Sequence, residues 1–199
     1  MQLALRSTAN PTTKRIVAVT RTGAPQSSLG AGMRLQLKAA RVTSRTCFAA
    51  LPAHVADALL NQNGSLGAGG ALEATWKADA VGGTGAPEQQ QRSVLLTWAG
   101  GSSAKPDTLE LSHAMCDAIG LAEGALLTVT LRTKVAGISR INVEPRSADD
   151  WEVMQLHAGL LEDQILNQVR AVMEGMTLPL WISPSSLVHT FSKVNSIVT

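Results

Sequence analysis

The sequence has 199 residues, of which 45% are hydrophobic, and a formal net charge of +2. This length can hold one sizeable domain or two small lobes. No apolar run approaches the roughly 20 residues that span a bilayer, and no apolar segment follows Met1, which argues against a transmembrane helix and a secretory signal. Cys47 and Cys116 have no partners at metal-like spacing, and we expect reduced, buried thiols in an intracellular protein.

The small net charge hides an asymmetry, because no acidic residue precedes Asp57 and the second half of the chain is rich in carboxylates. The basic residues before Asp57 are Arg6, Lys14, Arg15, Arg21, Arg34, Lys38, Arg41 and Arg45. Basic segments attract phosphates, and the shortage of aromatic residues favours an anionic, phosphoinositide-bearing membrane or an acidic protein over nucleic acid. The candidate lipid-binding residues are Arg34, Lys38, Arg41 and Arg45. The alternative is that these charges only keep the protein soluble.

Residues 1–32 are rich in Ser, Thr, Gly, Pro and Ala, and Pro11 and Pro25 interrupt any helix. We expect a disordered basic leader, with an organelle transit peptide as the alternative.

Residues 33–98 contain a series of short elements. Alternation over 34–38 predicts a half-buried strand with Arg34, Gln36 and Lys38 on one side, and places Arg41 and Arg45 in the loop that follows. Residues 46–60 predict a short strand, then a helix that begins near Pro52 and buries Val55, Leu59 and Leu60. Further strands are expected at 71–76 and 93–98, after glycine-rich loops at 63–70 and 78–92.

Residues 108–131 repeat the plan of the first half: a strand, Ser112 as helix N-cap, a short helix, Gly120 as C-cap and another strand. This internal duplication predicts a double-psi β-barrel lobe over 33–132, although periodicity alone leaves other small barrels open.

Residues 133–199 predict a second, smaller α+β lobe, so the fold class is α+β. A strand is expected over 135–145, a helix over 147–174 that Gly159 interrupts and Gly175 ends, and a strand over 178–183. The apolar stripe expected to face the core is Trp151, Met154, Ala158, Leu161, Ile165, Val169 and Val172. Ser147 and Asp150 have capping-box spacing, so Asp149 and Asp150 indicate a helix cap rather than a catalytic dyad.

No catalytic, cofactor or metal site can be named from the sequence. The motifs of P-loop ATPases, dinucleotide-binding proteins and α/β-hydrolases are absent. His113 and Cys116 lack further ligands nearby, and His54 and His157 are interpreted as ordinary helix residues. The four tryptophans lie at expected strand ends or a helix start, and we interpret them as packing anchors: Trp76, Trp98, Trp151 and Trp181.

One stretch carries a family resemblance: INVEPRSADDWEVMQLHAGLLEDQILNQVRAV at residues 141–172. Shorter segments accompany it: PLWIS (179–183) and, upstream, CFAALP, EATW, LTW and IGLAEG. Together these segments resemble the amino-terminal domain of the peroxin-one family of peroxisome-biogenesis AAA ATPases. The resemblance covers residues 33–183, and the sequence after Ser183 no longer follows the family.

The resemblance implies a non-catalytic module. Such domains are similar to the amino-terminal domains of valosin-containing protein and N-ethylmaleimide-sensitive fusion factor, which have a double-psi barrel, a second lobe and an inter-lobe cleft that binds adaptors. The implied setting is a cytoplasmic ATPase at the peroxisomal membrane that assembles with a peroxin-six-like ATPase and recycles the receptor for matrix-protein import.

The ATP and Mg²⁺ of that family belong to cassettes that this sequence lacks. We therefore expect a fragment, an incomplete gene model or a stand-alone copy. Two alternatives remain open: a small double-psi-barrel enzyme of unknown chemistry, and an organelle protein with a transit peptide.

Overall fold

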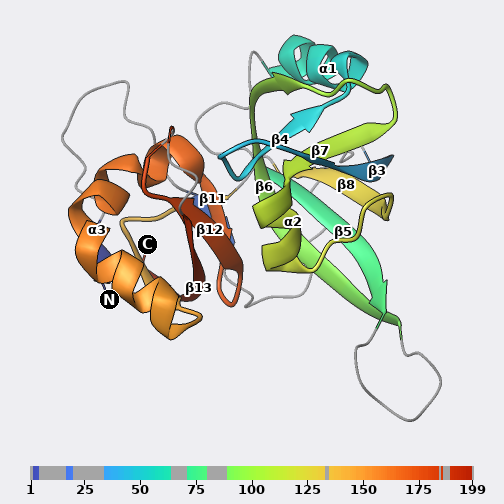
Figure 1. Ribbon diagram of the computed structural model, residues 1–199. Coiled ribbons are helices and arrows are strands. Elements are labelled where there is room, and N and C mark those ends of the chain that lie inside the picture. The colour runs from blue at the N-terminus through green and yellow to red at the C-terminus, as the bar shows by residue number, and fades with distance from the viewer. Residues whose placement is uncertain are drawn as a thin grey trace.

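The computed structural model describes residues 2–4, 17–19, 34–63, 71–79, 89–132, 135–183, 185 and 189–198. These residues form a closed barrel with two helices and, beside it, a lobe in which one long helix packs on a sheet (Figure 1). The Arg6, Lys14, Arg15 and Arg21 side chains and the glycine-rich loop at 64–70 lie outside the described residues.

Six strands close the barrel in the order β3-β7-β4-β6-β5-β8. They are β3 (Arg34–Val42), β4 (Phe48–Leu51), β5 (Ala71–Asp79), β6 (Gln89–Ser102), β7 (Thr108–Ser112) and β8 (Leu126–Arg132). β5 and β6 extend to Asp79 and from Gln89, so the loop between them is shorter than the 78–92 expected from its glycines.

The barrel has the symmetry that the internal duplication predicted. Exchanging β3 with β6, β4 with β7 and β5 with β8 maps the parallel pair β3–β7 onto β6–β4. The same exchange maps the antiparallel pair β3–β8 onto β6–β5. In each half a helix joins the second strand to the third, which confirms the double-psi barrel.

Apolar side chains at alternate positions of the strands fill the interior of the barrel. Leu37 and Ala39 of β3 are buried, whereas Arg34, Gln36 and Lys38 are exposed, as the alternation predicted. Arg41 is also part of β3, so its expected place in a following loop is wrong, while Arg45 does lie in the bend after the strand.

The two barrel helices are α1 (Ala53–Asn63) and α2 (His113–Ile119). α1 buries Val55 and Leu59, but Leu60 is 45% exposed and is not on the core face. The caps of α2 are confirmed. Ser112 accepts a hydrogen bond from the Met115 amide at 3.2 Å, and Gly120 ends the helix with a φ of 68°, a left-handed conformation that favours glycine.

The second lobe has a four-stranded sheet in the order β1-β10-β13-β12 and a three-stranded sheet in the order β11-β2-β9. The strands are β1 (Gln2–Ala4), β2 (Val17–Val19), β9 (Ala136–Gly137), β10 (Arg140–Pro145), β11 (Ala171–Met173), β12 (Thr177–Trp181) and β13 (His189–Val198). β13 pairs with β10 on one side and β12 on the other, so it lies inside the sheet.

Two short segments of the expected leader are strands of this lobe. Gln2–Ala4 pairs with β10, and Val17–Val19 pairs with both β11 and β9. These pairings come from residues more than 100 positions away, so composition alone gave no sign of them, and the expectation of a wholly disordered leader is wrong for these six residues.

Helix α3 (Ala148–Gln168) packs on the sheet through Met154, Leu161 and Ile165, three members of the predicted stripe. It differs from the prediction in two ways. The interruption lies at His157, with φ −123° and ψ 20°, rather than at Gly159. The helix also ends at Gln168 instead of 174, because residues 171–173 pair as β11 with the distant β2.

The end of α3 connects the two lobes. The buried Gln168 side chain accepts the Trp181 backbone N–H at 2.8 Å and donates to the Trp181 carbonyl at 2.7 Å. The Gln168 carbonyl accepts the backbone N–H of Cys47, which belongs to the barrel lobe, at 3.0 Å. The Cys47 thiol donates to the Pro179 carbonyl at 3.4 Å, and burial raises its pKa.

Asp150 holds the start of α3 on β13. Ser147 is the helix N-cap, as predicted: its Oγ accepts the Asp150 backbone N–H at 3.1 Å and donates to Asp150 Oδ2 at 2.7 Å. Asp150 Oδ1 accepts the Phe191 backbone N–H at 2.7 Å. Burial alone would raise the pKa of Asp150, but the hydrogen bonds from Phe191 and Ser147 outweigh it and lower this pKa below its ordinary value.

The tryptophans differ in burial. Trp76, Trp98 and Trp181 are 5%, 8% and 3% exposed, as packing residues should be. Trp151 is 43% exposed, so its interpretation as a packing anchor of the second lobe is wrong. It occupies the first turn of α3 at a position that turns toward solvent, whereas Met154, three residues later, faces the sheet.

The burial difference gives a first prediction. Trp181→Ala should lower the free energy of unfolding by about 3–5 kcal/mol, because it empties a large core site. Trp151→Ala should lower it by about 1 kcal/mol or less, as for an exposed position. Urea denaturation of both variants at neutral pH measures this, and equal losses would contradict the assignment.

A second prediction concerns the neighbouring aspartates. Asp150→Ala should cost about 1–3 kcal/mol, because the Phe191 N–H loses a charged acceptor. Asp149→Ala is the matched control, and it should cost less than about 1 kcal/mol at an exposed first turn. Urea denaturation compares the two variants with the wild-type chain.

The effect of Asp150 should depend on pH. Because its folded-state pKa is lowered, its carboxylate stabilises the fold fully above the unfolded-state pKa of about 3.9. That contribution is lost as the pH falls toward the lower folded-state pKa. The stability difference between wild type and Asp150→Ala should therefore shrink below about pH 4, and a difference independent of pH would refute this role.

Candidate functional site

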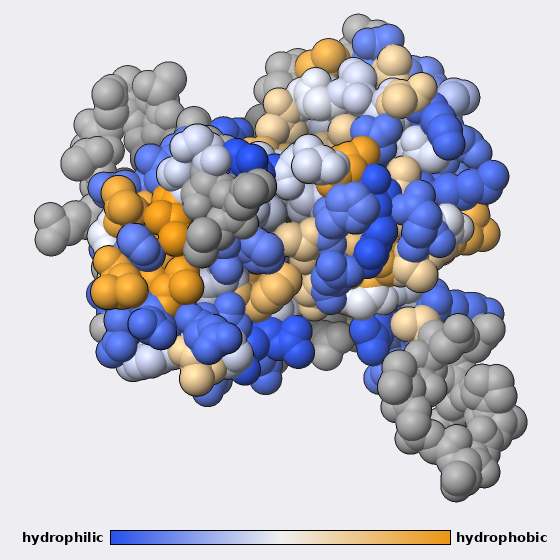
Figure 2. All heavy atoms as spheres, viewed as in Figure 1, coloured by the Kyte–Doolittle hydropathy of each residue, from blue (hydrophilic) through white to orange (hydrophobic). Residues whose placement is uncertain are grey.

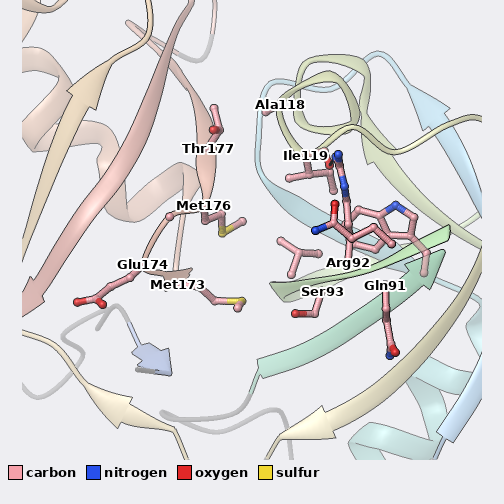
Figure 3. A pocket seen from close by; sticks show the side chains of 13 residues that line it. Gln91, Arg92, Ser93, Ala118, Ile119, Met173, Glu174, Met176 and Thr177 are labelled. Carbon is pink, nitrogen blue, oxygen red and sulfur yellow. Dashed lines mark hydrogen bonds between the residues drawn. The ribbon is translucent and has the colours of Figure 1, made fainter. Parts of the chain in front are cut away.

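A cavity of about 310 Å³ lies between the two lobes. β11 packs against β6 and β12 against α2, so the barrel forms one wall and the β11–β12 turn forms the other (Figure 3). The barrel residues that line it are Trp76, Gln90, Gln91, Arg92, Ser93, Val94, Ala118 and Ile119, and those of the second lobe are Met173, Glu174, Gly175, Met176 and Thr177. We call this cavity the inter-lobe cleft.

Arg92 is the positive charge of the barrel wall. It stands opposite Trp76 in the β5–β6 ladder, and its Nη1 donates to the Ile119 carbonyl at 3.3 Å, at the end of α2. A Cβ on the next residue, Gly120, would lie 2.5 Å from Arg92 Nη1. Gly120 therefore serves twice, since it ends α2 in a left-handed conformation and leaves room for the guanidinium.

Trp76 is buried against the same wall, and its indole Nε1 has no hydrogen-bond partner among the described residues. A buried N–H without an acceptor costs free energy. By contrast, Trp98 Nε1 donates to the Gly101 carbonyl at 2.7 Å. The cleft wall thus contains a hydrogen-bond donor that the described part of the fold leaves unsatisfied.

The β11–β12 turn is fixed by its own hydrogen bonds. Gly175, with φ 80°, donates its N–H to the Val194 carbonyl at 2.7 Å, and the Val194 N–H donates to the Met176 carbonyl at 2.8 Å. Met173 and Met176 point across the cleft toward the barrel (Figure 3). Methionine side chains adapt their shape to different apolar groups, so this wall suits an apolar side chain of a ligand.

The lining of the cleft combines one guanidinium with uncharged polar and apolar side chains and one carboxylate. Its lining residues include no histidine or cysteine, and its single carboxylate, on Glu174, points away from Arg92 (Figure 3). No nucleophile and base therefore meet there. The arrangement offers a cation and two flexible thioethers to a ligand that enters between the lobes.

Two of the four candidate lipid-binding residues form ion pairs within the barrel lobe. Lys38 lies 3.2 Å from Asp107, and Arg41 lies 2.5 Å from Asp117 and donates to the Leu121 carbonyl. Asp107 directly precedes β7, and Asp117 lies in α2. Both acids are far from Lys38 and Arg41 in the sequence, so no local pattern indicated these ion pairs. Arg34 lies at the start of β3 and Arg45 in the bend after it.

The His113 and Cys116 pair does not form a metal site in the described part of the chain. His113 is exposed, whereas Cys116 is fully buried, so the two side chains point to different environments. Burial raises the pKa of the Cys116 thiol to about 11, which keeps it protonated at neutral pH despite the nearby Arg41. Both cysteines are free and buried thiols.

No helix in the described ranges is both long and apolar enough to cross a membrane. The second lobe matches a known family: the profile described as "Peroxisome biogenesis factor 1, N-terminal" matches residues 139–198. This match runs through β13, so the expectation that the family resemblance ends at Ser183 is wrong.

Relatives extend the match over the barrel. The Peroxisomal ATPase PEX1 of Dictyostelium discoideum is 32% identical over 152 residues, which cover 73% of this chain and 12% of the relative. The human Peroxisomal ATPase PEX1 is 28% identical over 149 residues, covering 73% of this chain and 10% of the relative. That of Komagataella phaffii is 31% identical over 108 residues, covering 52% and 10%.

The chain thus spans about a tenth of the length of these relatives. The matches cover both the barrel and the second lobe, whose arrangement agrees with the fold that the resemblance implied. The chain belongs to the family of amino-terminal domains of the peroxisomal ATPase PEX1.

Proposed function

We propose that this domain recruits protein adaptors to a peroxisomal AAA ATPase, and that the adaptors bind in the inter-lobe cleft. The observation that carries the proposal is the cleft itself, with Arg92 on one wall and two methionines on the other. A partner segment with an apolar side chain and a nearby carboxylate would pack on the methionines and pair with Arg92.

In this proposal the domain acts in peroxisome biogenesis at the cytoplasmic face of the peroxisomal membrane. The ATPase that it serves assembles with a peroxin-six-like ATPase and recycles the receptor for matrix-protein import. ATP and Mg²⁺ then bind to cassettes of the longer relatives rather than to this domain, whose sequence lacks the P-loop motif.

Binding to anionic or phosphoinositide-bearing membranes is a secondary part of the proposal. The exposed Arg34 and Lys38 on the outer face of β3 support it. Asp107 and Asp117 weaken it, because they partly neutralise Lys38 and Arg41, and a lipid phosphate would have to compete with these carboxylates.

The cleft proposal can be tested in cells. We would replace the amino-terminal domain of Komagataella phaffii PEX1 with this chain and follow the import of a fluorescent peroxisomal matrix protein. Ser93→Arg and Thr177→Arg add bulk to half-buried positions on opposite walls of the cleft, and both should reduce import several-fold. Leu126→Arg, on an exposed residue of β8, is the matched control and should not.

Two outcomes would refute the cleft proposal. One is normal import by the variants with a filled cleft. The other is equal import by an ATPase that lacks the domain altogether. Circular dichroism of each purified domain variant distinguishes loss of binding from loss of folding.

The enzyme alternative makes the opposite prediction to ours. We expect the purified 199-residue chain to hydrolyse no ATP, because the backbone amides and lysine of a P-loop are missing. Phosphate release with and without Mg²⁺ measures this. Saturable, metal-dependent turnover that persists through repeated purification would favour the enzyme alternative.

A further inference from the structure

The outer face of α3 carries apolar residues that the described part of the fold leaves exposed. Leu156 and Leu160, on either side of the interruption at His157, are 71% and 51% exposed. Asp149 and Glu152 before that interruption and Asp163 after it are also exposed. Figure 2 shows apolar surface over α3 bordered by hydrophilic residues. We call these five residues the outer α3 face.

This face is not an extension of the core. The side of α3 that packs on the sheet is provided by Met154, Leu161 and Ile165, each at most 1% exposed. Neighbouring leucines on a helix surface form the pair of anchors that helix-in-groove and helix–helix recognition uses. The outer α3 face is also distinct from the inter-lobe cleft, because no α3 residue lines the cleft.

The charge of α3 indicates the kind of partner. The helix contains five acidic residues and no Lys or Arg. The nearest basic residues in the sequence, Arg146 and Arg170, lie beyond its two ends. The acids are Asp149, Asp150, Glu152, Glu162 and Asp163. A cationic partner would be attracted to this surface, and its lysines or arginines would flank its apolar residues.

The same charges disfavour two other occupants. A second copy of this chain joined by a two-fold axis through the face would bring the acidic residues of one α3 against those of the other. An anionic membrane surface would be repelled for the same reason.

We propose that the outer α3 face binds a cationic amphipathic helix of a partner protein. Apolar side chains of that helix pack on Leu156 and Leu160, and its basic side chains lie beside Glu152 and Asp163. This second surface would let the domain hold one partner on α3 while the inter-lobe cleft holds another.

A synthetic peptide tests the proposal without knowledge of the natural partner. The probe is a fluorescent 18-residue peptide of Leu, Lys and Ala whose leucines share one helical face. The control peptide has the same composition with the leucines spread around the helix. Fluorescence anisotropy with the 199-residue chain should show at least about tenfold tighter binding of the probe, and higher salt should weaken it.

Domain variants locate the binding. Leu156→Ala combined with Leu160→Ala should weaken binding of the probe at least about tenfold. Leu60→Ala on α1 and Leu126→Ala on β8, which also change exposed leucines, should leave it unchanged. Glu152→Lys with Asp163→Lys should weaken binding and reduce its salt dependence, whereas Asp57→Lys on α1 should do neither.

The charge variants keep every apolar contact, so they remain informative if the leucine variants fold poorly. Equal binding of the two peptides, or binding indifferent to the leucine and charge variants on α3, would overturn the proposal. Light scattering and vesicle co-sedimentation of the chain alone complete the test. Dimers or membrane binding that disappear in the leucine variant would assign the face to a second copy or to lipid instead.

Discussion

Gln168 is a buried junction between the two lobes, beside the packing of β11 on β6 and of β12 on α2. It is 3% exposed, and it makes two hydrogen bonds to the backbone of Trp181, so it takes the place of a neighbouring strand at the end of β12. The backbone carbonyl of the same residue accepts the Cys47 N–H from the barrel lobe. One residue therefore joins the end of α3, the edge of a sheet and the barrel. If the buried side-chain amide lost its partners, its hydrogen bonds to Trp181 would be lost together, and this would cost free energy of folding.

The inter-lobe cleft follows from this junction. With Trp181 held at one end of β12, the other end of the strand places Met176 and Thr177 opposite Arg92 and Ile119. Arg170 adds a second link, since its guanidinium lies 5.2 Å from the centre of the Phe48 ring on β4. Both walls are thus positioned by buried contacts rather than by a ligand, and a preformed cleft loses less conformational entropy when a partner binds.

Local patterns predicted the barrel well and the second lobe less well, for a physical reason. Alternation in β3 and the caps of α2 depend on residues a few positions apart, and the internal duplication is visible when the two halves of the barrel sequence are aligned. β11 instead exists because Ala171–Met173 pairs with Val17–Val19, more than 150 residues away, and a helical spacing of valines there was misleading. The cleft was expected only from the family resemblance, because Trp76, Arg92 and Met176 meet through tertiary packing. Gln168 did leave a signal: a polar residue at a position that continues the buried stripe of Leu161 and Ile165.

The acidic start of α3 illustrates how far a sequence motif can be interpreted. Capping and the helix dipole explain why carboxylates are tolerated there, and they apply equally to Asp149 and Asp150. The structure separates the two: Asp150 bonds to β13 inside the lobe, whereas Asp149 faces solvent with Glu152 and the leucines that follow. Trp151, between Asp150 and Glu152, is exposed for a geometric reason. Successive helix positions turn by about 100°, so only one of three neighbouring residues can face the sheet. The motif therefore combines a structural clamp at Asp150 with neighbouring side chains that are exposed at the surface.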